Sequence, residues 1–208
     1  MLLAIDAGNT NIVFAVYDGD AIRAQWRAVT VQSRTADEYA VWLSQLLALE
    51  GLSFADLDAA IIATVVPAVL FDLRDLCRKY LKTEPLRIGD PALDIGPRPT
   101  VDRPETVGAD RLCNTVAAHD RYPGAVIVVD FGTATNFDIV SEKGAFCGSV
   151  IAPGANLSVE ALHQAAALLP RVAIARAQKV IGRDTAGAMQ SGVYWGYVGL
   201  IGGLIGRI

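Results

Sequence analysis

The sequence predicts an α/β protein made of two similar domains, and two observations support this fold class. The first is a repeated turn, because Ile5-Asp6-Ala7-Gly8-Asn9-Thr10-Asn11 has a later counterpart in Val129-Asp130-Phe131-Gly132-Thr133-Ala134-Thr135-Asn136. The second is that each copy lies between two apolar runs and begins a series of strands followed by helices. Asp and Gly keep the same spacing in both copies. Such repetition indicates two copies of one structural unit.

The first half reads as a three-stranded meander followed by alternating helices and strands. β-rich runs joined by short polar turns predict the meander, and apolar residues at helical spacing predict the helices. A Pro-rich stretch at 89–107 cannot hold a regular ladder, so we expect a loop there. The predicted strands are 2–6, 12–17, 21–28, 59–66 and 86–88, and the predicted helices are 35–49, 69–81 and 109–119.

The second half begins in the same way and then lacks the later strands. After the helices we find no further β-rich run, so the second domain reads as incomplete at its C-terminal end. We therefore expect an N-terminal domain over 1–115 and an incomplete C-terminal domain over 116–208. The predicted strands of this half are 125–130, 136–141 and 145–151, and its predicted helices are 157–168 and 185–207.

Composition excludes several classes of function. The 208 residues carry a net charge of −4 without a Lys/Arg-rich run, which argues against a nucleic-acid or anionic-membrane partner. No apolar segment approaches the ~20 residues needed to span a bilayer, and Met1 leads directly into a strand rather than a signal peptide. Three widely spaced cysteines predict free thiols in a reducing cytoplasm. His119 and His163 are isolated and predict structural or surface roles.

The repeated turns are the first candidate site. A carboxylate at a strand end can hold a cation, while nearby turn amides receive phosphate oxygens. Gly8 and Gly132 would let the backbone approach a ligand closely. The alternative for Asp6 or Asp130 alone is an Asp that bonds its own turn. Two copies with one spacing favour the ligand-binding interpretation.

Two further motifs each have a structural alternative that the residues leave open. In Gly108-Ala109-Asp110-Arg111, Asp could act as a general base and Arg could bind a carboxylate or phosphate. The same residues would equally suit a helix start, with Asp110 complementing the helix dipole. Likewise, Asp184 before Thr185 is explained as a helix N-cap without any function.

Taken together, these motifs resemble the type III pantothenate kinase family. One motif alone would be weak, whereas five in the family's order along the whole chain are highly specific. The matching residues are Asp6-Ala7-Gly8-Asn9-Thr10-Asn11-Ile12, Pro104-Glu105-Thr106-Val107-Gly108-Ala109-Asp110-Arg111-Leu112, Val129-Asp130-Phe131-Gly132-Thr133-Ala134-Thr135, Ile151-Ala152-Pro153-Gly154, and Thr185 with Ala188-Met189-Gln190-Ser191-Gly192.

The resemblance implies the fold of the actin-like ATPase superfamily, with two ribonuclease-H-like domains on either side of a cleft. It implies ATP-dependent phosphorylation of pantothenate to 4′-phosphopantothenate, the first step of coenzyme A biosynthesis. It also implies Mg²⁺ with the ATP, a monovalent cation (K⁺ or NH4⁺), a cytoplasmic location, and a homodimer whose sites lie near the interface.

The resemblance also implies roles for individual residues. Asp110 would accept the proton of the substrate's primary hydroxyl, Asp130 would hold the monovalent cation, and Asp6 would hold Mg²⁺. The pantothenate-binding residues would be Gly108, Ala109, Asp110, Arg111 and Thr185, with Arg111 meeting the carboxylate. The ATP-binding residues would be Asp6, Ala7, Gly8, Asn9, Thr10, Asn11, Ile12, Val13 and Thr133.

Two features depart from the family pattern. The loop just before the Pro104–Leu112 motif, Pro99-Thr100-Val101-Asp102-Arg103, lacks the Tyr that family members often carry there. The Thr-Gly-Gly turn that family members carry further along is also absent, since Gly202-Gly203 falls in the predicted final helix. We therefore expect weakened ATP binding and an exposed edge of the second sheet. The alternatives are a non-catalytic relative of the Bvg accessory factor type and a phosphatase-type relative. Retention of Asp6, Asp110, Arg111 and Asp130 together favours the kinase.

Overall fold

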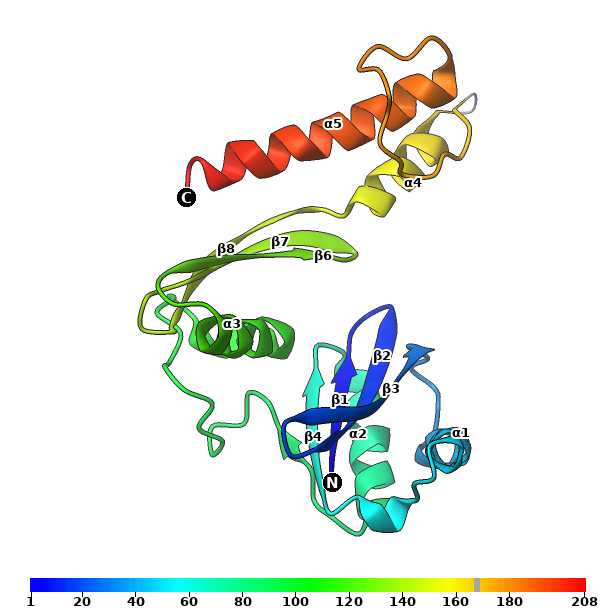
Figure 1. Ribbon diagram of the computed structural model, residues 1–208, viewed down its shortest axis with the longest axis vertical. Helices are drawn as coiled ribbons and strands as arrows, with labels where there is room; N and C mark the ends of the chain where they lie inside the picture. Colours follow the sequence, from blue (N-terminus) through cyan, green and yellow to red (C-terminus); the bar gives the residue numbers. More distant parts are fainter. Residues whose placement is uncertain (167–168) are drawn as a thin grey trace.

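Two β-sheets and the helix between them define the architecture (Figure 1). The computed structural model describes residues 1–166 and 169–208. Sheet A has the strand order β3-β2-β1-β4-β5, and sheet B has the order β6-β7-β8. The strands of sheet A are β1 (Leu2–Ala7), β2 (Asn11–Asp18), β3 (Ala21–Val29), β4 (Ala59–Thr64) and β5 (Leu86–Arg87).

Sheet A contains the predicted meander, since β1, β2 and β3 pair antiparallel in sequence order. β4 then pairs with β1 in parallel, and β5 pairs with β4 in parallel. Alternation along β2 buries Ile12, Phe14 and Val16 completely on one face. The opposite face of sheet A is turned toward the candidate functional site.

Helices α1 (Ala36–Leu49) and α2 (Pro67–Leu76) cover the buried face of sheet A. Phe14 of β2 stacks at ring-centroid distances of 5.8 Å on Tyr39 and 5.3 Å on Trp42, both from α1. Leu43 of α1 and Leu73 of α2 are fully buried in the same core. The core of the first half is therefore the apolar layer between sheet A and these two helices.

Helix α3 (Ala109–Arg121) lies between the two sheets (Figure 1). It contacts β4 of sheet A and also β6 and β7 of sheet B. The Pro-rich stretch before it is irregular, as predicted, apart from a short 3-10 turn at Pro104–Thr106. Its Thr100 N–H donates to the Phe146 carbonyl at 2.8 Å, which ties the loop to sheet B.

Sheet B repeats the antiparallel meander with three strands. These are β6 (Val126–Phe131), β7 (Ala134–Val140) and β8 (Phe146–Pro153). In the described part of the chain β6 and β8 each pair only with β7, so both edges of the sheet are unpaired, and the expected exposed edge is present. Helices α4 (Ala155–Ala165) and α5 (Thr185–Ile205) lie on the side of sheet B away from α3 (Figure 1).

Several predicted boundaries differ from the structure, and one of these differences has a clear physical reason. The strand predicted at 59–66 ends at Thr64, and Pro67 is the first residue of α2 rather than the end of a strand. Proline suits this first helical position because its missing N–H would be unpaired there anyway. The helix predicted at 157–168 begins at Ala155, and its residues 167–168 lie outside the described part.

The predicted domain boundary between residues 115 and 116 falls inside α3, and it stays a prediction. No helix in the described residues combines the length and the apolar character that crossing a membrane requires.

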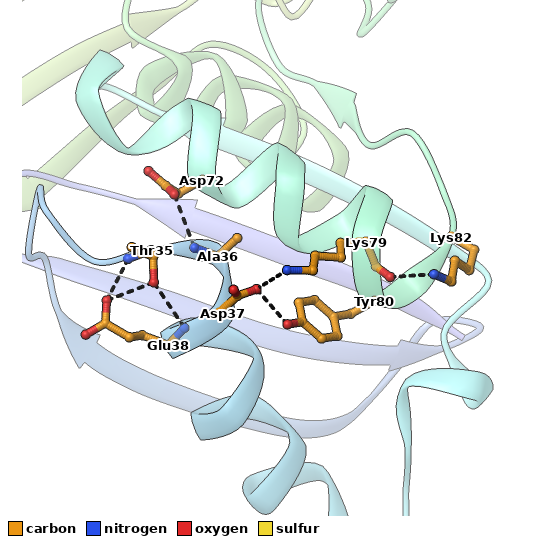
Figure 2. Close-up of polar contacts among 8 residues, drawn as sticks. All are labelled: Thr35, Ala36, Asp37, Glu38, Asp72, Lys79, Tyr80 and Lys82. Atoms are coloured by element: carbon orange, nitrogen blue, oxygen red, sulfur yellow. Dashed lines mark hydrogen bonds and ion pairs between the residues drawn. The ribbon is translucent and has the colours of Figure 1, made fainter.

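The start of α1 is fixed by a network of polar contacts (Figure 2). Thr35 Oγ1 accepts the N–H of Glu38, and Glu38 Oε2 accepts the N–H of Thr35 at 2.8 Å, which forms a capping box. Asp72 of α2 accepts the N–H of Ala36 at 3.1 Å. Asp37 accepts from Lys79 and from Tyr80 at 2.6 Å each. These bonds connect α1 to the helical segment that follows β4.

Replacing Thr35 with Ala tests this cap. We expect Thr35→Ala to lower the free energy of unfolding by about 1 kcal/mol, because the first turn of α1 loses a partner for a backbone N–H. Urea denaturation followed by circular dichroism measures the loss. Ser44→Ala is the matched control, since the Ser44 hydroxyl donates to the Val41 carbonyl within the same helix and caps nothing. Equal losses in both variants would contradict the capping role.

Candidate functional site

The two repeated turns meet in space. Thr10 Oγ1 of the first turn and Thr133 Oγ1 of the second lie 3.1 Å apart, within hydrogen-bond distance. The first turn connects β1 to β2, and its Gly8 N–H donates to the Asn11 carbonyl at 3.0 Å. The second turn connects β6 to β7, and its Gly132 N–H donates to the Ala134 carbonyl at 2.9 Å. The two copies of the sequence repeat therefore lie next to each other in the structure.

Each turn accepts a supporting hydrogen bond from a residue just after a neighbouring strand. The hydroxyl of Thr30, just after β3, donates to the Gly8 carbonyl at 2.6 Å. The N–H of Gly154, just after β8, donates to the Thr133 carbonyl at 3.0 Å. Gly154 has no room for a side chain, because a Cβ there would fall on the carbonyl oxygens of Gly132 and Thr133. Gly154 is the last residue of the sequence motif Ile151-Ala152-Pro153-Gly154, and in the structure it supports the second turn.

The first turn offers a ligand its backbone and a few exposed side chains. Asp6, Asn9 and Thr10 are exposed, whereas Ala7 and Ile12 are fully buried. Of the predicted ATP-binding residues, Ala7 and Ile12 therefore offer a ligand neither side-chain nor main-chain surface in this structure. Gly8, Asn11 and Val13 are half-buried, and Thr133 of the second turn is exposed.

Three carboxylates gather where the turns meet. Asp6 is exposed on one side, but neighbouring protein atoms remove part of the water around its carboxylate, and this partial desolvation raises the pKa of Asp6 above its ordinary value; the carboxylates of Asp110 and Asp130 raise this pKa further. Like charges this close repel one another, so a bound cation would stabilise the arrangement. Among the described residues no three acidic, His or Cys side chains lie close enough to ligate one metal ion. A cation here would therefore need backbone, hydroxyl, phosphate or water oxygens as well.

Helix α3 begins at this site. Asp110 lies in its first turn, and its Oδ1 accepts the backbone N–H of Arg111 at 2.8 Å. A side chain at Gly108, before the helix, would require the Asp110 carboxylate to move, because a Cβ would lie 2.5 Å from Asp110 Oδ1 and 3.3 Å from Val65 Cγ1. The negative charge of the Asp110 carboxylate thus interacts favourably with the positive end of the helix dipole, which is the structural role that the sequence left open for this residue. It is also close enough to Asp6 to raise the pKa of that residue.

Arg111 reaches from α3 onto sheet B. Its Nη1 donates to Ser149 Oγ at 2.7 Å, and its Nη2 donates to Asn136 Oδ1 at 3.3 Å. Its Nε lies 3.8 Å from Asp138 Oδ1 in an ion pair. Ser149 pairs with Asp138 across the β7–β8 ladder, so the three partners come from adjacent positions of the sheet. The guanidinium of Arg111 is therefore held by sheet B while its helix starts beside sheet A.

Asp138 is the residue of this site that sequence reasoning missed. Its side chain is 1% exposed, and burial raises its pKa to about 6, with Arg111 opposing this rise and Asp110 and Asp130 adding to it. The available signal was a polar pair, Asn136 and Asp138, at strand spacing between the apolar Phe137 and Ile139. Residues two apart on a strand share a face, and this face is the one toward α3.

A cavity of about 250 Å³ lies between the exposed face of sheet A and α3. Burial raises the pKa of the Cys113 thiol to about 11, so this thiol stays protonated at neutral pH, in agreement with the free, structural cysteine that the sequence predicts. The cavity is lined mainly by small and apolar side chains, and Asp6 is one of its polar lining residues. The small and apolar side chains include Ala4, Ala15, Ile61, Ala63 and Cys113.

Thr185 is the predicted site residue that the structure does not bring to the others. It is the first residue of α5, where Asp184 Oδ1 accepts the N–H of Gly187 at 2.7 Å as the predicted N-cap. α5 packs on α4, on the side of sheet B away from α3 (Figure 1). Within one chain, Thr185 therefore does not join Gly108, Asp110 and Arg111.

Known proteins share this fold. A solved structure of a conserved putative Baf family transcriptional activator from Campylobacter jejuni matches with a TM-score of 0.56 and 19% identity, over 96% of this chain and 77% of that one. A putative 2-dehydro-3-deoxygalactonokinase from Sinorhizobium meliloti matches with a TM-score of 0.56 and 14% identity, over 100% of this chain and 82% of that one. At such identities the likeness concerns the fold alone, and it confirms the predicted fold of actin-like ATPases and sugar kinases.

Sequence relatives are far more similar. Residues 2–207 match the type III pantothenate kinase family. Type III pantothenate kinases from Paramagnetospirillum magneticum and Rhodospirillum rubrum are 64% and 62% identical over all 208 residues, which span 80% and 81% of those relatives' lengths. Together with the facing turns and the first turn of α3, these matches show that the chain belongs to the type III pantothenate kinase family, the enzymes that phosphorylate pantothenate in coenzyme A biosynthesis.

Proposed function

We propose that this kinase transfers the γ-phosphoryl group of ATP to the primary hydroxyl of pantothenate, with Asp110 as the proton acceptor. Transfer of a phosphoryl group asks the protein mainly for positioning and for neutralisation of charge. An alcohol does not ionise near neutral pH, so Asp110 accepts the hydroxyl proton late, as the bond from the phosphoryl group to ADP breaks. The product is 4′-phosphopantothenate.

The two turns are the proposed phosphate site. Accessible amides between Asp6 and Val13 would receive phosphate oxygens, and Thr133 would contact ATP from the opposite turn. The observation that carries this proposal is the 3.1 Å contact between Thr10 and Thr133, because it brings hydroxyls of both turns to one point. Small hydroxyl residues and close backbone are what a phosphate group needs at such a turn.

Cations are the second part of the proposal. Asp6 would hold the Mg²⁺ that accompanies ATP, and Asp130 would hold a monovalent cation, K⁺ or NH4⁺. The pKa of Asp6 is raised chiefly by desolvation, and the further rise caused by the carboxylates of Asp110 and Asp130 supports a cation here, because it reflects negative charge from all three residues. Bound cations neutralise charge that develops on the transferred group.

Pantothenate would lie along the start of α3. Gly108 and Ala109 would form its wall, and Arg111 would bind its carboxylate through guanidinium N–H groups. Thr185 would come from a second copy of the chain, which accounts for its separation from Arg111 within one copy and agrees with the homodimer that the family resemblance implies. We also infer a cytoplasmic location from the metabolic role of the family.

Asp110→Asn tests the proton acceptor. We expect kcat for pantothenate-dependent ADP release to fall on the order of 10²–10⁴-fold, because an amide cannot accept the hydroxyl proton. Pantothenate binding, measured by calorimetry, should change little. Asp120→Asn, at the exposed far end of the same helix, is the matched control and should retain full activity. An unchanged kcat in the Asp110 variant would rule out this assignment.

Asp130→Asn tests the monovalent cation site. Wild-type activity should rise when KCl replaces choline chloride at constant ionic strength, whereas the variant should lose most of this response because the amide carries no charge to hold K⁺. The Mg²⁺ dependence should stay close to wild type. A full K⁺ response in the variant would show that the cation binds elsewhere.

Gly154→Ala tests the support of the second turn. The added Cβ must displace the carbonyls of Gly132 and Thr133, so we expect KM for ATP to rise at least several-fold while the protein stays folded. Gly199→Ala, which meets no atom within 4 Å in α5, is the control and should leave KM unchanged. An unchanged KM for ATP in Gly154→Ala would separate this turn from nucleotide binding.

A further inference from the structure

Burial of the Asp138 carboxylate costs folding free energy, and the fold alone does not explain why the protein accepts this cost. Its side chain is 1% exposed, and neither carboxylate oxygen has a hydrogen-bond partner among the described residues. An isolated buried carboxylate destabilises a protein, since burial removes its hydration without replacing it. Such an unfavourable group in an enzyme commonly has a functional reason.

The charged neighbour of Asp138 with opposite sign is Arg111. The ion pair between Arg111 Nε and Asp138 Oδ1 spans 3.8 Å, too long for a hydrogen bond but short enough for strong attraction in a buried site. The other charged groups that face Asp138 are the carboxylates of Asp110 on α3 and Asp130 on β6, which repel it. Asp138 is thus held in place by the sheet and draws the guanidinium of Arg111 toward it.

The same guanidinium is bound on two further sides. Ser149 and Asn136 each accept one N–H from Arg111, at 2.7 Å and 3.3 Å. A guanidinium has five N–H groups in one rigid plane, so these contacts together with Asp138 fix that plane and leave two N–H groups for a ligand. Without Asp138, the guanidinium of Arg111 would lose the charged partner of its Nε on sheet B.

We propose that Asp138 is a positioning residue that holds Arg111 against sheet B, so that two guanidinium N–H groups point to the carboxylate of pantothenate. The inference rests on the proposed role of Arg111 in pantothenate binding. It assigns to Asp138 a part in substrate recognition without direct contact with the substrate. It also explains why sheet B carries a buried acid without a hydrogen-bond partner at the position beside Ser149.

The test measures binding of pantothenate and of ATP by calorimetry in the wild-type chain and in Asp138→Asn. We expect the Kd for pantothenate to rise about tenfold, a typical coupling between contacting charged groups, while the Kd for ATP stays the same. On an Arg111→Lys background, Asp138→Asn should add little further loss, because Asp138 acts through Arg111. Asp120→Asn should affect neither ligand.

Stability separates positioning from a merely structural role. Because burial raises the pKa of Asp138 from about 4 to about 6, the folded state loses stability as pH rises through this window, and the full loss is present above pH 6. Asp138→Asn removes that loss, so its melting temperature should equal or exceed the wild-type value at pH 8. A structural role predicts a lower melting temperature and weaker binding of both ligands.

Each possible result of these measurements either supports or overturns the proposed role of Asp138. Selective weakening of pantothenate binding with intact stability supports the inference. Wild-type affinity for pantothenate in Asp138→Asn overturns it while leaving the proposed function in place. An additive loss on the Arg111→Lys background, or weakened binding of both ligands, also overturns it. A wild-type chain that binds ATP but no pantothenate at millimolar concentration removes the proposed function, and this inference falls with it.

Discussion

The first turn of α3 is the element on which the rest of the site depends, because it is fixed to both sheets at once. On one side Gly108 packs so closely on Val65, just beyond β4, that a Cβ would lie 3.3 Å from it. On the other side Arg111 bonds to Ser149 and Asn136 of sheet B. The two sheets are thereby held at a separation that lets Thr10 and Thr133 meet. Any shift of α3 would move both phosphate turns relative to Asp110.

Charge balance is the second constraint. The carboxylates of Asp110 and Asp130 repel both Asp6 and Asp138, whose pKa values are raised mainly by loss of water around them, while Arg111 pairs with Asp138. Such a site is unstable by itself and suits ligands that bring cations and a phosphate chain together. The protein therefore keeps a concentration of negative charge that its substrates complete. Enzymes commonly accept a local loss of stability of this kind for the sake of activity.

Much of this could be predicted from the sequence, and the remainder could not for physical reasons. The repeated turns were predictable since their Asp, Gly and Thr residues are local and keep one spacing. The meanders followed from alternation, as in Ile12, Phe14 and Val16. The partnership of Arg111 with Asp138 depends on how α3 crosses sheet B, which no local pattern encodes. The role of Pro67 as a helix start was hidden because the preceding apolar run continues through Val66.

The central claim is that pantothenate lies between Arg111 and the phosphate turns, with its primary hydroxyl at Asp110. A crystal structure with pantothenate and a non-hydrolysable ATP analogue tests it directly. The measured quantity is the distance from the hydroxyl oxygen to the nearer Asp110 carboxylate oxygen. The account predicts about 2.6–3.2 Å, with the pantothenate carboxylate on Arg111 and the γ-phosphate between Thr10 and Thr133. A hydroxyl that faces away from Asp110, or a carboxylate bound far from Arg111, would contradict it.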